Sequence, residues 1–168
     1  MSERYEFFVK GKPMLPEPYN AASMGLPNVW LLNGVEFSDH PSYGPCVAIL
    51  HTDELTDAIG HAVATKRTPL TGDEMLFLRK RMGLKQAELA KLLRVAEQTI
   101  LNYEKGKTEA GPADIAIRAL YLAHREPSAG TADALRQIAA AAIETSNRPA
   151  RRKPARAGEW HEFIDRAA

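Results

Sequence analysis

The chain has 168 residues, of which 45% are apolar and 26% are charged, and its formal net charge at pH 7 is +1. This composition is that of a globular protein with room for one ordinary domain or two small ones. No stretch approaches the roughly 18 consecutive apolar residues of a membrane span, and the first residues lack the apolar run of a signal peptide. The single cysteine, Cys46, excludes an internal disulfide and a four-cysteine zinc site. We therefore expect a cytoplasmic protein without metal or cofactor.

The charges are distributed unevenly along the chain. Lys and Arg against Asp and Glu number 5 against 8 in residues 1–70, 10 against 8 in residues 71–126, and 7 against 5 in residues 127–168. This asymmetry suits DNA binding by the middle of the chain and an acidic N-terminal module.

Residues 1–68 predict a small β-rich module. The apolar runs 29–32 and 35–37 flank Asn33-Gly34, the pair favoured in a type I′ turn, so a hairpin is expected there. Residues 46–50 predict a further strand.

A helix and a linker are expected to close this module. Asp53 can cap a helix that carries Leu55 and Ile59 on one side, and residues 65–69 have the composition of a linker.

Three aromatic residues are expected to form the core of the N-terminal module, namely Trp30, Phe37 and Tyr43. An exposed aromatic patch that contacts a partner is the alternative interpretation.

Residues 69–126 have a helical period throughout. Thr71 and Glu74 have the spacing of a capping box, in which each side chain binds a backbone amide at the start of the helix. Gly83 and Gly106 are placed to end helices, since glycine readily adopts the left-handed conformation needed there. Four helices are therefore expected, beginning after Thr71, at Gln86, after Ala96 and at Pro112.

The second and third of these helices predict a helix-turn-helix. They are joined by Arg94-Val95-Ala96, with the small Ala90 where the helices cross and Val95 filling the turn. A helical bundle for protein contacts is the alternative, because Met75, Leu89, Leu92 and Ile100 would form a core in either case.

Several residues of this segment resemble the Xre/Cro-type helix-turn-helix of bacterial and phage repressors. They are Leu84, Gln86, Glu88-Leu89-Ala90, Val95, Thr99-Ile100 and Tyr103-Glu104-Lys105-Gly106. The resemblance implies a lambda-repressor-like all-α domain. The end of the third helix, followed by a helix that begins with proline, is also similar to the C-terminal domain of MqsA-like antitoxins, which place a partner-binding domain before the DNA-binding one. The N-terminal domain of those antitoxins commonly binds zinc through cysteine pairs, which this chain lacks.

The resemblance also implies roles for individual residues. Arg79 and Glu104 match positions that pair across the first and third helices. Carboxamides suit adenine in the major groove, and a carboxylate can accept from a cytosine amine. The residues expected to face bases are Glu97, Gln98, Thr99 and Asn102, and those expected to contact phosphate are Gln86, Lys85, Lys105 and Lys107.

Two residues depart from the family pattern at the turn. Arg94 replaces a common glycine, which costs about 1–2 kcal/mol if that residue is left-handed. Ala96 lacks the oxygen that usually caps the third helix.

The end of the chain predicts a C-terminal helix within residues 127–146 and a basic flexible tail over 147–168. Trp160, Phe163 and Ile164 form a short amphipathic segment that is too brief to be stable unless it is docked.

Taken together, these features predict a two-domain α+β protein that binds double-stranded DNA specifically. The expected function is that of a transcriptional regulator, a dimeric repressor that reads a palindromic operator with the helix around residues 97–105. The alternative is an antitoxin-type protein whose N-terminal module neutralises a toxin-like partner; a small ligand could also bind this module. His40, Cys46 and His51 are interpreted as ordinary loop and core residues rather than as a zinc or nucleophile site, so no enzyme is expected.

Overall fold

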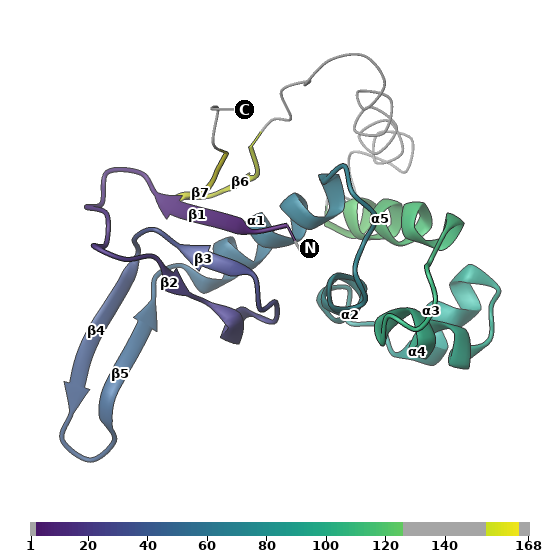
Figure 1. Ribbon diagram of the computed structural model, residues 1–168, viewed down its shortest axis with the longest axis horizontal. Helices are drawn as coiled ribbons and strands as arrows, with labels where there is room; N and C mark the ends of the chain where they lie inside the picture. Colours follow the sequence, from purple (N-terminus) through teal and green to yellow (C-terminus); the bar gives the residue numbers. More distant parts are fainter. Residues whose placement is uncertain (1–2, 126–153, 165–168) are drawn as a thin grey trace. The chain divides into compact units, whose positions relative to one another are not determined.

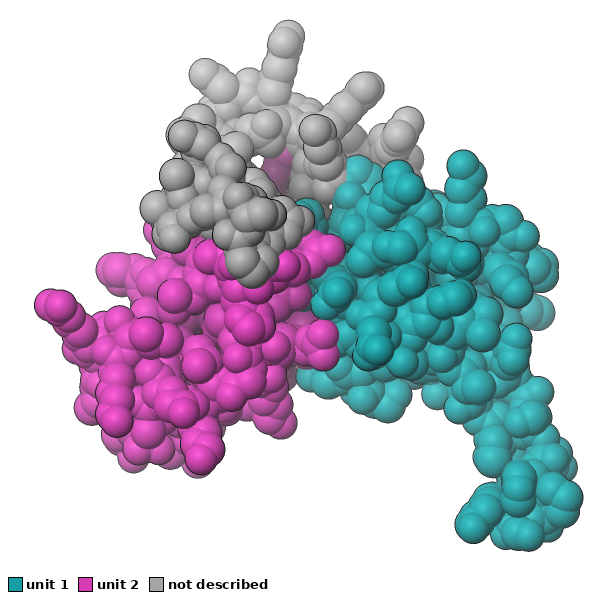
Figure 2. Space-filling model, turned by 180° about the vertical axis from the view of Figure 1, so that it is seen from behind, with its two compact units in different colours: residues 1–62, 154–168 teal, residues 63–153 magenta. Residues whose placement is uncertain are grey.

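The computed structural model describes residues 3–125 and 154–164 (Figure 1). The chain forms two compact units, shown in different colours in Figure 2. Residues 1–62 and 154–168 make up the β unit, and residues 63–153 make up the helical unit. A strand-rich unit followed by a unit of helices confirms the predicted α+β class.

A five-stranded sheet organises the β unit, with the strand order β2-β3-β1-β7-β6. The first strand, β1, pairs in parallel with β3 and antiparallel with β7. Alternate residues of β1 are buried and give the sheet its apolar face, as a half-buried strand requires. The bounds are β1 Tyr5–Val9, β2 Tyr19–Asn20, β3 Val29–Leu31, β6 Arg156–Ala157 and β7 Trp160–Phe163.

The core of the β unit also includes a helix and a short 3-10 turn. Helix α1, Thr52–Thr65, runs behind the sheet in Figure 1 and buries Leu55 and Ile59 completely. The 3-10 turn, η1, spans Ala22–Met24 and leads to the buried Leu26.

A second, two-stranded sheet consists of β4, Val35–His40, and β5, Gly44–Ile49. The two strands are antiparallel and run away from the five-stranded sheet (Figure 1). Residues 46–50 were expected to form a strand, and β5 covers most of them.

The predicted hairpin at Asn33-Gly34 is wrong, because β3 pairs with β1 and β2 rather than with β4. The Asn33 side chain is buried and binds the backbone of Val9, with the Val9 N–H donating to Oδ1 at 2.6 Å and Nδ2 donating to the Val9 carbonyl at 3.0 Å. Gly34 has φ +73°, and a Cβ there would lie 2.6 Å from the Trp160 ring. These two residues serve long-range contacts instead of a turn.

The predicted flexible tail over 147–168 is wrong for residues 156–163, which form β6 and β7 at the edge of β1. Trp160 anchors them, since its ring is fully buried and its Nε1 donates to the Leu50 carbonyl at 2.9 Å. The amphipathic segment around Trp160, which was expected to be stable only when docked, therefore packs on the sheet as strand β7. The predicted helix within 127–146 lies outside the described residues.

The predicted aromatic core is also wrong for two of its three members. Phe37 is 62% exposed and Tyr43 is 83% exposed. Trp30 is half-buried on the outer face of the sheet, where the Arg4 guanidinium lies 4.5 Å from its ring centroid. The core instead contains aromatic residues from both ends of the chain, Tyr5, Phe7 and Trp160.

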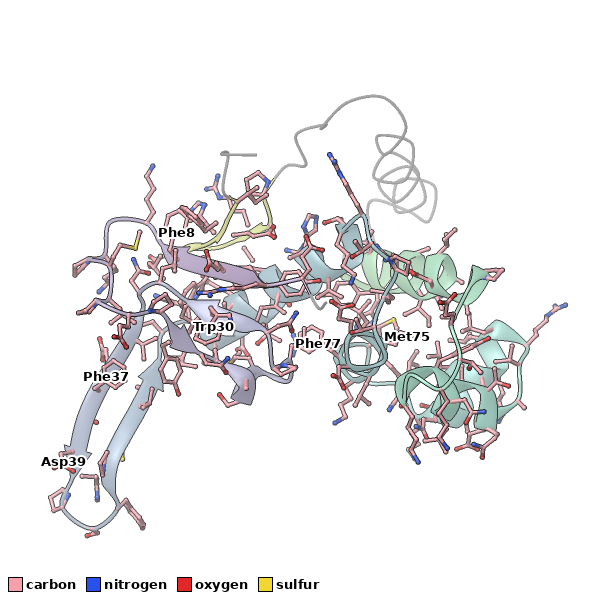
Figure 3. All side chains as sticks on the ribbon, viewed as in Figure 1. Phe8, Trp30, Phe37, Asp39, Met75 and Phe77 are labelled. Carbon is pink, nitrogen blue, oxygen red and sulfur yellow. The ribbon has the colours of Figure 1, made fainter. Side chains whose placement is uncertain are left out.

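The helical unit contains the four predicted helices, α2 Gly72–Arg81, α3 Gln86–Leu93, α4 Glu97–Glu104 and α5 Pro112–Arg125. The capping box is confirmed: the Thr71 N–H donates to the Glu74 carboxylate at 2.7 Å, and the Glu74 N–H donates to the Thr71 hydroxyl at 3.4 Å. Met75, labelled in Figure 3, is buried. The fully buried side chains of this unit include Leu78, Leu89, Ile100 and Ile117.

Two apolar residues of the helices lie at the surface. Leu92, expected in the core, is 56% exposed, and Ile115 is 52% exposed. In α5, Ile117 and Tyr121 are buried while Ile115 is not.

Residues 63–70 belong to the helical unit and are not a free linker. The Arg118 guanidinium donates to the carbonyls of Lys66 and Thr68, both at 2.6 Å, and binds the Asp114 carboxylate. The Lys66 ammonium contacts Glu74 at 2.6 Å, with both side chains almost fully buried. The unit boundary accordingly falls after Ala62, within α1, and not at residue 68 as expected.

Candidate nucleic-acid interface

The turn between α3 and α4 is tight and left-handed at one residue. Arg94 has φ +55° and ψ +41°, and the Val95 N–H donates to the Ala90 carbonyl at 3.0 Å. Arg94, which stands where the family commonly has glycine, therefore adopts the left-handed conformation itself. This conformation is disfavoured because Cβ lies close to the following carbonyl. Ala96 begins α4 in an extended conformation without a side-chain cap.

The Glu104 side chain, on α4, links this helix to α2 and α3 through hydrogen bonds. Its carboxylate accepts from Arg79 Nε at 2.5 Å and Nη2 at 3.1 Å, and also from Gln86 Nε2 at 2.7 Å. Arg79 further donates to the Leu84 carbonyl at 2.8 Å, which ties down the segment before α3. The pair expected between Arg79 and Glu104 is thus present and mostly buried. Because such charge-assisted bonds are directional, this cluster fixes how α4 lies against α2 and α3.

Gln86 has a structural partner that its sequence position did not indicate. One hydrogen of its carboxamide nitrogen is engaged by Glu104, and the side chain is half-buried. The nitrogen carries a second hydrogen, so a phosphate contact is compatible with this geometry. That contact remains a prediction.

The outward face of α4 is polar while the inward face is apolar. Ile100 is fully buried, whereas Glu97 and Gln98 are exposed and Thr99 and Asn102 are half-buried. Gln98 Nε2 donates to Asn102 Oδ1 at 3.1 Å, so the two carboxamides lie side by side on the surface. The four residues expected to face bases share one short helix, and two of them are in direct contact.

Basic side chains surround the ends of these helices. Lys85 lies just before α3, with its N–H donating to the Glu88 carboxylate at 2.6 Å. Lys105 and Lys107 follow α4, and all three lysines are exposed. Exposed ammonium groups at these places can reach a phosphate backbone without disturbing the core.

The two units carry net charges of opposite sign, so the near-neutral net charge of the whole chain does not argue against DNA binding. The helical unit contains 17 Lys and Arg against 10 Asp and Glu, a net charge of +7, and the β unit contains 5 against 11, a net charge of −6. The near-neutral chain is therefore the sum of a basic and an acidic unit. A polyanion is attracted to the helical unit and repelled by the β unit.

Two features that position the site were not identified from the sequence. Gly72 packs against the end of α4, where an added Cβ would lie 2.3 Å from the Glu104 carbonyl oxygen. Asp114 accepts from the Leu70 N–H at 2.9 Å and pairs with Arg118 one helical turn later. The i,i+4 spacing of Asp114 and Arg118 was a usable signal for the pair, but nothing local indicated its partners in residues 64–70.

Residues 77–117 match the family model described as helix-turn-helix, from within α2 to within α5. This segment is an Xre-type helix-turn-helix domain. The protein is accordingly a DNA-binding transcriptional regulator. No curated protein and no solved structure matches the chain. The similarity to MqsA-like antitoxins stays a prediction.

Two further observations concern residues 3–125 and 154–164. No helix in these ranges is long and apolar enough to cross a membrane. Within the same ranges, no group of three His, Cys, Asp or Glu side chains is placed to hold a metal ion.

Proposed function

We propose that the protein is a dimeric repressor that reads a palindromic operator in the major groove with α4. The observation that supports this most is the hydrogen-bonded pair of carboxamides on the outward face of α4, Gln98 and Asn102, opposite the buried Ile100. In the free protein one hydrogen bond, from Gln98 Nε2 to Asn102 Oδ1, joins the two amides. On DNA each can instead donate to N7 and accept from N6 of an adenine, which provides about 1–3 kcal/mol of discrimination per bidentate pair.

The remaining residues take supporting roles in this proposal. Glu97 accepts from a cytosine amine and Thr99 contacts a neighbouring base edge, since both lie in the first turn of α4. Gln86, Lys85, Lys105 and Lys107 bind phosphates and set the register of the helix on the duplex. A symmetric dimer doubles the few base pairs that one helix can read.

The test is selection of bound fragments from random double-stranded DNA with the full chain. We expect two inverted half-sites whose centres lie about one helical turn, or a multiple of it, apart. Asn102→Ala should reduce discrimination at one base position by about 5-fold to 150-fold, which corresponds to 1–3 kcal/mol. Lys105→Ala, the matched variant, should weaken specific and random DNA alike and lower the salt slope by about one.

Each part of the proposal has its own contradicting result. A single uninverted site would argue against a symmetric dimer on a palindrome. If Asn102→Ala kept wild-type discrimination at every position, the base-reading role assigned to α4 would be wrong.

A second candidate, the antitoxin class, is supported by the charge of the β unit. A net charge of −6 on a unit with no role in attracting DNA suits a basic protein as its partner, and DNA binding would then regulate the protein's own operon. A neighbouring gene for a small basic protein, and a stable complex with its product, would favour this candidate over a free-standing repressor.

A further inference from the structure

The hairpin arm, which we define as β4, β5 and their turn (residues 35–49), is an amphipathic ribbon. Its register places Phe37 opposite Val47 and Val35 opposite Ile49, so these four side chains share one face. Glu36 and Ser38, in the alternate positions, share the other face with their partners. One side of the arm is therefore apolar along most of its length.

The apolar face is uncovered toward the tip of the arm. Val35 is buried at its base, but Phe37 and Val47 are 62% and 44% exposed. In Figure 3, Phe37 lies on β4 nearer the base of the arm and Asp39 nearer its tip. The ring contact of Phe37 with Tyr19, centroid to centroid 6.0 Å, covers only part of the ring.

This exposure is unfavourable for the free protein. A two-stranded hairpin is marginal in water unless a third element packs on it, and contiguous exposed apolar side chains can mark a contact site. Within the described residues, no further strand pairs with either outer edge of the arm. The arm thus offers both an apolar face and unpaired strand edges to a second molecule.

The charge of the arm and of the chain around it indicates which kind of molecule would dock there. Residues 13–65, which include the arm, contain six Asp and Glu and no Lys or Arg. Asp39 lies on the same face as Phe37, two residues further along β4, and Glu36 lies on the reverse face. A nucleic acid is disfavoured by this charge, and arm-to-arm contact with a second copy would bring two units of net charge −6 together. A cationic protein is complementary.

We propose that the hairpin arm is the docking surface for a basic protein partner, which packs apolar side chains on Phe37 and Val47 and places Lys or Arg beside Asp39. This deepens the second candidate of the proposed function by naming the surface. It requires neither toxin neutralisation nor a palindromic operator.

The experiment selects peptides from a phage-displayed library of random 12-residue sequences on the immobilised full chain, and then measures a selected synthetic peptide by fluorescence anisotropy. We expect the enriched sequences to be cationic with apolar residues, and their binding to weaken with salt. Phe37→Ser should reduce affinity at least tenfold, and Asp39→Asn about threefold with a smaller salt dependence. Leu92→Ser is the matched control, because Leu92 has similar exposure on α3 in the other unit and should leave affinity unchanged.

Several results would overturn the proposal. They are the absence of any enriched peptide, enrichment of neutral or acidic peptides, and equal binding by Phe37→Ser and wild type. A wild-type dimer in sedimentation velocity that dissociates in Phe37→Ser would assign the arm to a second copy instead. Amide hydrogen exchange at β1 in Phe37→Ser reports whether the β unit is folded, and operator binding, measured in parallel, keeps a failure of docking separate from a failure of DNA reading.

Discussion

The two units of this protein differ in net charge and in which parts of the chain build them. The helical unit is basic, and its described core and site come from one continuous stretch, residues 63–125. The β unit is acidic, and its sheet joins strands from both ends of the chain, with Glu6 paired to Phe163. The net charge of the whole chain, +1, therefore describes neither unit, because it is the sum of a net charge of +7 and one of −6.

Because the units differ in connectivity, different substitutions are expected to destabilise each one. The β unit depends on contacts between residues about 155 positions apart, which close a long loop before they stabilise anything. The described part of the helical unit depends instead on buried ion pairs within one continuous stretch of chain, residues 63–125.

The largest effect is expected from Trp160→Ala. Removing this fully buried ring from β7 should lower the free energy of unfolding of the β unit by about 3–5 kcal/mol, because a large cavity opens against Gly34 and Val9. DNA binding by the helical unit should persist. Amide hydrogen exchange resolved by residue distinguishes the units, with loss of protection in β1 and retention in α4.

Phe163→Ala is the control in the same strand. Phe163 is 45% exposed, so this change should cost under about 1 kcal/mol. Equal effects of the two variants would mean that β7 does not complete the sheet.

Lys66→Met should act on the helical unit with an effect of about 3–5 kcal/mol. It removes the ammonium from the buried Glu74 carboxylate, and breaking a buried pair from one side leaves the other charge uncompensated. Urea unfolding followed at α2 amides measures the loss.

The double variant Lys66→Met with Glu74→Gln tests the reason. A neutral carboxamide can still accept from the Thr71 N–H, so at least half of the lost stability should return. A double variant as unstable as the single one would show that packing of Lys66, and not its charge, matters.

Arg94→Gly should stabilise the helical unit by about 1 kcal/mol. Glycine adopts the observed left-handed conformation without the Cβ contact that strains arginine there. Arg94→Ala keeps the Cβ and also removes the charge, so it should give no such gain. A rise in the melting temperature for both variants would assign the effect to charge instead of backbone.

The smallest effect concerns pH and the β unit. Burial first, and then the charges of Arg156 and Lys10, lower the pKa of His161 below its ordinary value of 6.5. The unfolded chain then binds this proton more readily than the folded one, so the stability of the β unit decreases as the pH falls below about 6.5. His161→Gln should flatten that slope in unfolding measured from pH 7.5 to 5. His124→Gln, in the other unit, should leave it unchanged.

Most elements of the helical unit could be predicted because their signals are local. The capping residues Thr71 and Glu74, the glycines at 83 and 106, and Pro112 each act within about four positions of the chain. The outward position of Gln98 and Asn102 follows from the helical period in the same way. The bond from Gln86 to Glu104 was missed because it joins two helices through a residue type that suits several partners.

The misassigned elements of the β unit depended on distant residues. Asn33-Gly34 has the composition of a turn, but Asn33 is held by Val9 and Gly34 by the Trp160 ring. The aromatic residues Phe37 and Tyr43 looked like a core because hydrophobicity predicts burial, and the arm leaves them exposed.

The amino-acid sequence by itself determined the helical period, the caps and the polar face of α4, because these are set by neighbours three or four residues apart. Tertiary structure alone decided that residues 156–163 complete a sheet begun at Tyr5, that residues 63–70 belong with the helices through Arg118, and that β4 and β5 form a separate arm. Strand pairing and buried ion pairs have no fixed separation along the chain, so no local pattern specifies the partner.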